Sequence, residues 1–434
     1  MNIAAAFAKY HTTINSGTAW LGDIPADWGI KKMKFLFRDH SQKEMPNAEL
    51  LSVTQNQGVV PRTLVESRMV MPSGNLKSFK FIEKGDFAIS LRSFEGGLEY
   101  CHHDGIISPA YTVLKRKSEN LLPAYYRYLF KSAAFISELQ TSIVGIREGK
   151  NISFEELSYS LMPVPGLNEQ RAIAAFLDSN CAKIDEAVRI KEAQIKLLSE
   201  RRQILIQQAV TRGLNPDVPM KDSGTDWIVE IPVHWSLVPI LAVGEVIDPN
   251  PSHRNPEYVD EGFPFISTQE FRPGGVIEID TPRRVSKNTV EEQEKRCHFG
   301  KGSLVFSRKG TIGAVRVLPI GIRLGILDSL CVINPNRRVD PTYLFWSLSS
   351  DYLPAQYGPT LRGAALPQLS VGRVRSLKII LPPKNEQSEI VQHLKRETGK
   401  VDTAILIKQE QIAKLKEYKT SLINAAVTGK IKVI

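Results

Sequence analysis

Apolar residues recur at heptad spacing along two long segments that contain no proline. Residues 168–211 also lack glycine, and residues 385–428 contain only Gly399. On one helical stripe, apolar positions recur every three or four residues over several turns, a pattern typical of a coiled coil. The seam residues are Ile184, Val188, Ile195, Leu198 and Leu205 in the first segment, and Val401, Ile405, Ile412, Leu415 and Leu422 in the second. The sequence therefore predicts two long helices that pack through this seam, which Lys191, Lys408, Arg202 and Lys419 interrupt.

Both segments carry signals of helix ends. Prolines precede them, Asn168 and Asn385 are the expected N-caps, and Gly213 and Gly429 are the expected residues after the last turn. A helix of this length would span roughly 65 Å. Most of it would lack a partner if it packed only on its own globular segment. We therefore expect the two helices to form an antiparallel coiled coil.

The chain repeats one plan. Residues 16–28 (SGTAWLGDIPADW) and 223–235 (SGTDWIVEIPVHW) are identical at seven of thirteen positions, and the N-E-Q and A-V-T phrases of the two helices recur 217 residues apart. The loops between these anchors differ. This pattern predicts an internal pseudo-two-fold repeat in which one fold serves two different targets. The alternative is an old duplication whose halves drifted apart without a change of role.

The segments outside the helices have the pattern of α/β units. Short apolar runs bounded by glycine and proline predict strands at 86–91, 110–114, 303–307 and 376–381. Prolines at a first helical position predict helices at 123–140 and 341–353. We expect four segments: globular residues 1–165, a helix at 166–213, globular residues 214–382 and a helix at 383–434.

Charge and cysteine content narrow the partners and the compartment. Lys and Arg number 56 against 46 Asp and Glu, which gives a net charge of +10. A basic balance favours nucleic acid, although a basic protein without such a partner remains an alternative. The four cysteines form no C-x-x-C pair, so we expect no disulfide framework, no metal site and a cytoplasmic location. We also expect no signal peptide and no membrane span, since no apolar run reaches 18 residues.

Basic and amide residues in loops are the candidates for contact with DNA, because phosphates attract Lys and Arg while base edges pair with Arg, Lys, Asn and Gln. For each of them an ordinary solvated surface position is the alternative. The candidates are Gln55, Ser90, Arg92, Arg147 and Lys150 in the first half, and Gln269, Ser307, Arg308, Lys309 and Arg362 in the second.

The order and duplication of these phrases resemble one known family. The phrase W-x-x-x-I-P-x-x-W occurs twice, and each long helix opens near N-E-Q and closes at A-V-T followed by glycine. This arrangement is similar to that of the specificity subunits of type I restriction–modification systems, and the resemblance covers almost the whole chain. It implies two target-recognition domains that read the two halves of a split, asymmetric sequence in double-stranded DNA.

The resemblance also implies the division of labour in a larger complex. The paired helices would fix the spacing of the two readers, against a major groove that repeats about every 34 Å. They would dock two methyltransferase subunits, through which two restriction subunits join. S-adenosylmethionine, ATP and magnesium would bind to those partners, and this chain would carry no cofactor and no catalytic residue.

Two other classes of function remain as alternatives. One is a methyltransferase or nuclease with its own recognition domain. The phrase Asn255-Pro256-Glu257-Tyr258 is similar to the catalytic loop of an amino-methyltransferase, but it has Glu257 where that loop has a second proline, which argues against this alternative. The other is a coiled-coil adaptor that binds no DNA. The basic charge and the two diverged globular segments argue against the adaptor.

Overall fold

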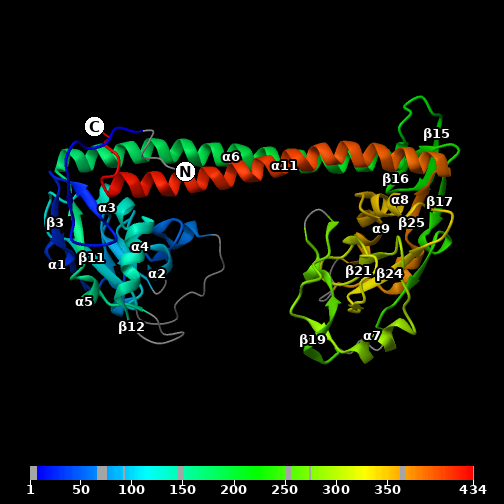
Figure 1. The fold of residues 1–434 in the computed structure, drawn as a ribbon, viewed down its shortest axis with the longest axis horizontal. Coiled ribbons are helices and arrows are strands. Elements are labelled where there is room, and N and C mark those ends of the chain that lie inside the picture. Colours follow the sequence, from blue (N-terminus) through cyan, green and yellow to red (C-terminus); the bar gives the residue numbers. More distant parts are fainter. Residues whose placement is uncertain are drawn as a thin grey trace. The chain divides into compact units, whose positions relative to one another are not determined.

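The computed structural model describes residues 7–65, 76–90, 93–144, 151–250, 256–272, 275–361 and 367–433. Its contacts divide the chain into two units, which are Met1–Lys191 with Glu410–Ile434 (unit 1) and Glu192–Gln409 (unit 2). Each unit contains one globular segment and a part of both long helices, α6 (Leu167–Arg212) and α11 (Lys384–Val427). Figure 1 shows the two helices and the strands and short helices of each unit.

Unit 1 is built on a four-stranded antiparallel sheet in the order β4 (Phe37–Asp39), β11 (Thr112–Arg116), β8 (Phe87–Ile89), β9 (Glu99–Tyr100). Antiparallel pairs surround it: β1 (Thr13–Asn15) with β2 (Asp23–Pro25), β3 (Gly29–Lys32) with β14 (Leu161–Val164), β5 (Leu51–Thr54) with β6 (Gly58–Pro61), β7 (Lys80–Ile82) with β10 (Gly105–Ile107), and β12 (Ile143–Val144) with β13 (Asn151–Ile152). The short helices are α1 (Met33–Leu36), α2 (Ser93–Gly96), α3 (Pro123–Leu129), α4 (Ala133–Leu139) and α5 (Phe154–Leu157).

Unit 2 repeats the four-stranded sheet and two of the outer pairs of unit 1. Its four-stranded sheet has the order β18 (Gly244–Ile247), β24 (Leu330–Pro335), β21 (Leu304–Ser307), β22 (Val315–Val317). The outer pairs are β15 (Met220–Thr225) with β16 (Ile228–Pro232) and β17 (Ser236–Pro239) with β25 (Lys378–Leu381), while β19 (Tyr258–Ile266) pairs with β20 (Arg284–Val285) and, in parallel, with β23 (Gly325–Ile326). Its short helices are α7 (Lys287–Glu294), α8 (Pro341–Leu348), α9 (Tyr352–Leu361) and α10 (Val371–Ser376). The predicted internal repeat is confirmed in the strand order.

The two predicted short helices were each too long. The stretch 123–140 breaks into α3 and α4, and 341–353 breaks between α8 and α9. At both breaks a long helix supplies an acceptor: Ala134 N–H donates to Asn424 Oδ1 at 3.0 Å, and Tyr352 N–H donates to Gln207 Oε1 at 3.2 Å. The start of each second helix thus has a tertiary contact, which the local sequence cannot indicate. In α4 a local cap adds to it, since Ser132 Oγ accepts Phe135 N–H at 3.3 Å.

The long helices pair within each unit. In unit 1, near the start of α6 and the end of α11, Lys419 Nζ lies 2.7 Å from Asp185 Oδ1. In unit 2, near the end of α6 and the start of α11, Arg202 Nε lies 2.8 Å from Asp402 Oδ1. The pairing is therefore antiparallel, as predicted, and the ten seam residues are buried or partly buried.

Three of the four cations that interrupt the seam, Lys191, Arg202 and Lys419, have partners across it. The Lys419–Asp185 and Arg202–Asp402 pairs are related by the same 217-residue offset as the helices. Lys191 Nζ also donates to Gln411 Oε1 at 2.8 Å. These cations keep their charged ends near water while their stems line the seam, so an imperfect heptad is compatible with packing.

The N-E-Q phrase joins each globular segment to a helix through its glutamine. Gln170 Oε1 accepts Leu122 N–H, and its amide donates to Asn120 O and Pro165 O. Gln387 does the same with Asp340 N–H, Arg338 O and Pro382 O. Both glutamines are 1% exposed. The expected asparagine N-caps were wrong, because α6 and α11 begin one residue earlier, at Leu167 and Lys384.

The glycines after the helices are required by backbone and packing together. Gly213 and Gly429 have φ of +75° and +71°, which confirms the predicted helix ends. A Cβ on Gly429 would lie 2.2 Å from Pro25 Cδ, and one on Gly213 would lie 3.0 Å from the Trp235 ring. The W-x-x-x-I-P-x-x-W phrase of each globular segment therefore packs on the end of a long helix.

Replacement of Gly429 by alanine should destabilise unit 1 by about 1–3 kcal/mol, because it adds a left-handed non-glycine residue and a clash with Pro25. The matched change Gly399→Ala adds a Cβ that meets nothing within 4 Å inside α11. It should therefore be neutral or stabilising. Urea unfolding of the two variants measures the difference, and equal stabilities would contradict this account.

Candidate nucleic-acid interface

Three segments of unit 2 form the candidate surface, which we call the unit 2 loop face: residues 267–272, 307–313 and 367–373. Lys309 forms an isolated bridge with Gln368, and Leu369 N–H donates to Arg308 O at 2.9 Å. The Thr268 hydroxyl lies 3.9 Å from the position of a Cβ on Gly310. Folding thus brings the predicted Gln269, Ser307, Arg308 and Lys309 onto neighbouring loops.

Arg308 and Ser307 support this surface from inside. Arg308 is 4% exposed and Ser307 is 0% exposed. The Arg308 guanidinium lies 3.1 Å from Asp248 Oδ2 and donates to Leu369 O and Asp328 O, and Ser307 Oγ donates to Lys309 O. Their donors are committed to the loop, so the sequence-based expectation that these two side chains face DNA does not fit their burial.

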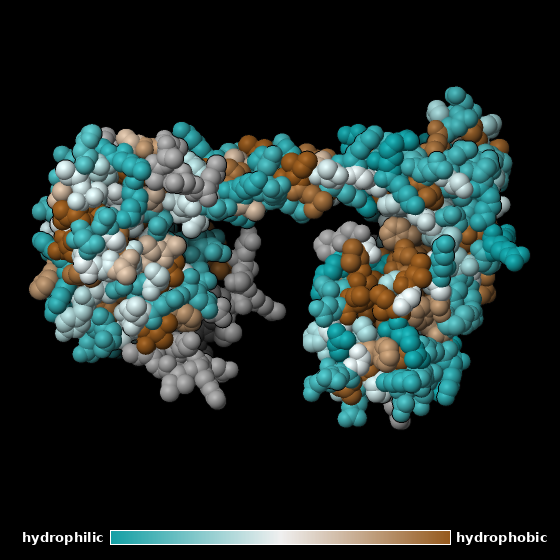
Figure 2. All heavy atoms as spheres, in the orientation of Figure 1, coloured by the Kyte–Doolittle hydropathy of each residue, from teal (hydrophilic) through white to brown (hydrophobic). Residues whose placement is uncertain are grey.

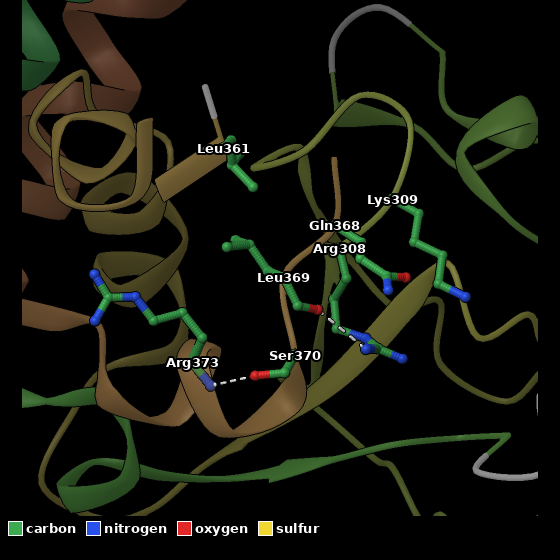
Figure 3. A pocket seen from close by; sticks show the side chains of 7 residues that line it. All are labelled: Arg308, Lys309, Leu361, Gln368, Leu369, Ser370 and Arg373. Carbon is green, nitrogen blue, oxygen red and sulfur yellow. Dashed lines mark hydrogen bonds between the residues drawn. The ribbon is translucent and has the colours of Figure 1, made fainter. Parts of the chain in front are cut away.

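Lys309 and Arg373 line a cleft on the same face. Arg308, Lys309, Leu361, Gln368, Leu369, Ser370 and Arg373 enclose a cleft of about 750 Å³. Figure 3 shows Lys309 and Arg373 on opposite sides of Arg308. The Lys309 side chain is 33% exposed and lies 2.6 Å from Asp328 Oδ2, and Arg373 donates to Gln356 O. The two cations flank an opening, and Lys and Arg are side chains that contact phosphate groups in protein–DNA complexes.

Sequence reasoning missed Gln368, Ser370 and Arg373 as members of this face. Ser370 Oγ caps α10 by accepting Arg373 N–H at 3.1 Å, and its counterpart Ser153 caps α5 by accepting Glu156 N–H. The repeated serine is therefore explained by helix capping. The basic phrase V-G-R-V-R after Ser370 is the sequence signal that identifies Arg373 as a candidate.

A buried carboxylate organises the turn that carries Gln269. Glu270 is 4% exposed and accepts Ser267 N–H at 2.8 Å, Thr281 Oγ1–H at 3.1 Å and Arg283 Nε–H at 3.0 Å. Burial alone would raise the pKa of Glu270. The hydrogen bonds from Arg283 and Ser267 outweigh burial, so the pKa lies below its ordinary value. Gln269 itself is exposed on this turn.

The unit 1 candidates lie in different local structure. Gln55 is exposed in the turn between β5 and β6, and Lys131 Nζ donates both to Gln55 O at 3.2 Å and to Glu99 Oε1 at 2.7 Å. Burial raises the pKa of Glu99 despite the neighbouring Lys131. Ser90 is partly buried, and its N–H donates to Ser93 Oγ. Arg92, Arg147, Lys150 and Arg362 lie outside the described residues.

Within the described ranges, His, Cys, Asp and Glu form no group of three or more that is arranged to hold a metal ion. The four cysteines are buried with free thiols. No helix in this part of the chain has the length and apolar character needed to cross a membrane.

The contribution of Glu270 to stability should disappear in acid. Its folded pKa is lowered from 4.5, so the stabilisation is present above that value and is lost as the pH falls through the folded pKa. The stability difference between the natural chain and Glu270→Gln should therefore shrink below about pH 4.5. Urea unfolding across pH measures it, with Glu292→Gln on an exposed position of α7 as control. A difference that stays constant in acid would refute the assignment.

Comparisons with known proteins agree with this architecture. Residues 232–417 match the model of the type I restriction modification DNA specificity domain. The chain is 25% identical to the putative type I restriction enzyme MjaX specificity subunit of Methanocaldococcus jannaschii, over 95% of this chain and 96% of that protein. It is 23% identical to the EcoBI specificity subunit of Escherichia coli, over 65% of this chain and 60% of that protein.

The fold is also found in a solved structure. A chain from a structural study of complex assembly and conformational transition of the type I R-M system has a TM-score of 0.68 and 18% identity, with 93% of this chain and 98% of that chain covered. The duplicated fold, the paired helices and these matches lead to one conclusion. The chain is similar over nearly its full length to type I restriction enzyme specificity subunits.

Proposed function

We propose that this chain reads a bipartite, asymmetric sequence in double-stranded DNA for a type I restriction–modification complex. The observation that carries this proposal is the repeat of one strand order in units that bear different loops. In this proposal residues 1–165 and 214–382 are the two target-recognition domains. Residues 166–213 and 383–434 are the helical segments that join them and dock partners.

We infer from the similarity to specificity subunits that the chain is a non-catalytic DNA-recognition subunit. In our proposal the duplicated helices offer two related docking sites for two methyltransferase subunits, and two restriction subunits join through these. S-adenosylmethionine, ATP and magnesium belong to those partners. Four buried thiols without a disulfide support a reducing cytoplasmic environment.

The cations of the unit 2 loop face are the proposed phosphate contacts. Lys309, which is partly exposed and paired with Asp328, and Arg373, which is exposed, line the cleft, while Arg308 holds the loop from inside. This division revises the expected roles, because a side chain with its guanidinium bonded to Asp248 and two carbonyls cannot reach DNA without breaking those bonds. Gln55 and Gln269 remain the proposed base-contacting residues, and Ser90, Arg92, Arg147, Lys150 and Arg362 remain proposed contacts.

Exposed leucine and isoleucine side chains support the docking role of the helices. In unit 2, Leu197 and Ile204 are 64% and 55% exposed and stand seven residues apart on α6, hence on one face of it. Figure 2 shows hydrophobic side chains at the surface of the helices. An exposed apolar face on a helix that is otherwise well paired is the kind of surface that a protein partner covers.

Lys309→Ala and Arg373→Ala should each weaken binding to DNA of any sequence. Each variant should reduce the slope of log affinity against log salt by roughly 0.9, because one phosphate contact is lost. Gel-shift titration of the full chain with its methyltransferase partner on random-sequence duplexes measures this, with Lys221→Ala on β15 as the control. Unchanged slopes would show that this cleft does not bind phosphate.

The same samples test the two alternative functions. A coiled-coil adaptor that binds no DNA would give no gel shift in any sample, and a methyltransferase would transfer methyl groups as the purified chain alone.

Leu197→Asp with Ile204→Asp should weaken capture of the methyltransferase subunit by roughly 30-fold or more, because a desolvated apolar contact is lost. Co-purification and titration of the partner measure it, and circular dichroism checks that α6 is intact. Gln194→Asp adds one negative charge at another exposed position of the helix, without removing an apolar side chain, and should bind normally. Equal affinity of the double variant and this control would place the docking surface elsewhere.

A further inference from the structure

The turn of residues 267–272 is held by far more polar contacts than an ordinary surface turn needs. The Glu270 carboxylate accepts the backbone N–H and hydroxyl of Ser267 and the hydroxyl of Thr281, and it forms a two-pronged ion pair with Arg283. Arg283 Nη2 also donates to Ser267 Oγ at 2.7 Å. We call this group of Ser267, Glu270, Thr281 and Arg283 the carboxylate clamp. It ties the turn to the strand-proximal segment 281–283.

The clamp is buried under the turn, and this burial indicates its role. Glu270 and Arg283 side chains are 5% and 20% exposed. A buried ion pair contributes little net stability, since desolvation opposes the attraction, and apolar side chains of similar size often serve as well. Such groups do fix one backbone conformation in several systems. The clamp is therefore best understood as a device that holds the turn in a single shape.

The residue that this shape presents is Gln269. Its backbone N–H donates to Ser267 Oγ at 3.1 Å and its carbonyl accepts Arg272 Nη1–H at 2.7 Å, so its main chain is immobilised on both sides. Its side chain is exposed, and no partner for the side-chain amide is recorded among the described residues. A fixed backbone with an outward amide is the arrangement that direct base recognition requires, because a mobile turn would lose ordering entropy on binding.

The surroundings of Gln269 fit a DNA surface. Thr268 lies beside Gly310, which follows Lys309 at the cleft of the unit 2 loop face. Arg272 is on the same turn and is half exposed, and besides its hydrogen bond to Gln269 O its guanidinium lies 3.7 Å from Glu278 Oε2. Beneath the turn, the Arg316 guanidinium lies 4.8 Å from the centre of the Phe271 ring and donates to Arg272 O. Cations that attract phosphates thus stand next to a rigid amide.

Unit 1 places a glutamine over a buried charge pair as well, but with different residues. Lys131 bridges the carbonyl of Gln55 and the Glu99 carboxylate, which is 1% exposed. Glu99 lies on β9, and the position that corresponds to it in unit 2 is Arg316 on the matching strand β22. Glu270 is therefore not the counterpart of Glu99. The two supports therefore lie at different positions of the repeat, while the residue whose main chain they contact or carry is glutamine in both units.

We propose that Gln269 reads one adenine–thymine pair in the half-site bound by unit 2, and that Glu270 and Arg283 are its positioning residues. The inference rests on the proposed DNA-recognition function and deepens it. Glutamine pairs in two-pronged fashion with N6 and N7 of adenine in the major groove, which gives the base preference. The clamp acts on recognition only through the orientation of Gln269.

The test uses the full chain assembled with its methyltransferase subunit and a pool of duplexes randomised over the target, with sequencing of the bound fraction. Gln269→Ala should reduce the preference for adenine at one position by roughly 5- to 150-fold and leave the other positions intact. Gln269→Arg should move the preference at that position towards guanine. Asn288→Ala, which removes an exposed amide from α7, should leave every position unchanged.

The clamp is tested by a change that keeps its volume. Glu270→Met with Arg283→Met should preserve the fold in thermal unfolding yet reduce the preference at the Gln269 position, with binding to random DNA changed by less than about threefold. Thr281→Val, which removes one donor to Glu270 and leaves the ion pair, should give a smaller loss at the same position and covers the case in which the double variant fails to fold. A loss spread over all positions would mark the clamp as structural and overturn its positioning role.

The outcomes separate this inference from the function on which it rests. A defined sequence preference that survives both Gln269→Ala and Gln269→Arg overturns the inference and leaves the proposed function standing. Absence of any sequence preference in the natural complex overturns the proposed function itself.

Discussion

The structure depends on the burial of helix ends in the globular cores. In unit 1, Ile173 and Leu177 near the start of α6 and Leu422 and Ala426 near the end of α11 belong to the same core as the sheet. In unit 2 the roles are exchanged, with Ile206 and Val210 from α6 and Ile390 and Leu394 from α11. Neither globular segment has a complete core without both helices. This explains why contacts divide the chain across its sequence order.

Polar contacts then define how each globular segment is attached. Gln170 and Gln387 each form hydrogen bonds with three backbone groups at the start of a long helix. Gly213 after α6 and Gly429 after α11 leave room for the W-x-x-x-I-P-x-x-W phrase to pack on the helix end. Buried polar groups are tolerated when their hydrogen bonds are made, and they then restrict the geometry of the joint. The phrases that recur in the sequence therefore contain the residues that attach each globular segment to the long helices.

The surfaces between the joints are where the two units differ. The Glu270–Arg283 pair supports a short helical turn in unit 2, and the Glu99–Lys131 pair supports a hairpin turn in unit 1. Arg308, a strong candidate by residue type, is consumed in the interior of its loop. A shared frame with separately built loops suits two readers with different targets, because loop changes leave the joints and the seam undisturbed.

The long helices, the seam and the repeat could be predicted from the amino-acid sequence. These features follow from local periodicity and from identities at a constant offset, which need no knowledge of distant contacts. The sequence also indicated the loops that carry Gln269 and Lys309. Tertiary structure alone decided the rest. The hydrogen bond that joins the start of α4 to Asn424 spans nearly 300 residues of the chain, and the burial of Arg308 depends on Asp248 and Leu369. Whether a polar side chain faces solvent or satisfies a distant carbonyl is set by long-range packing, which residue type and local pattern do not contain.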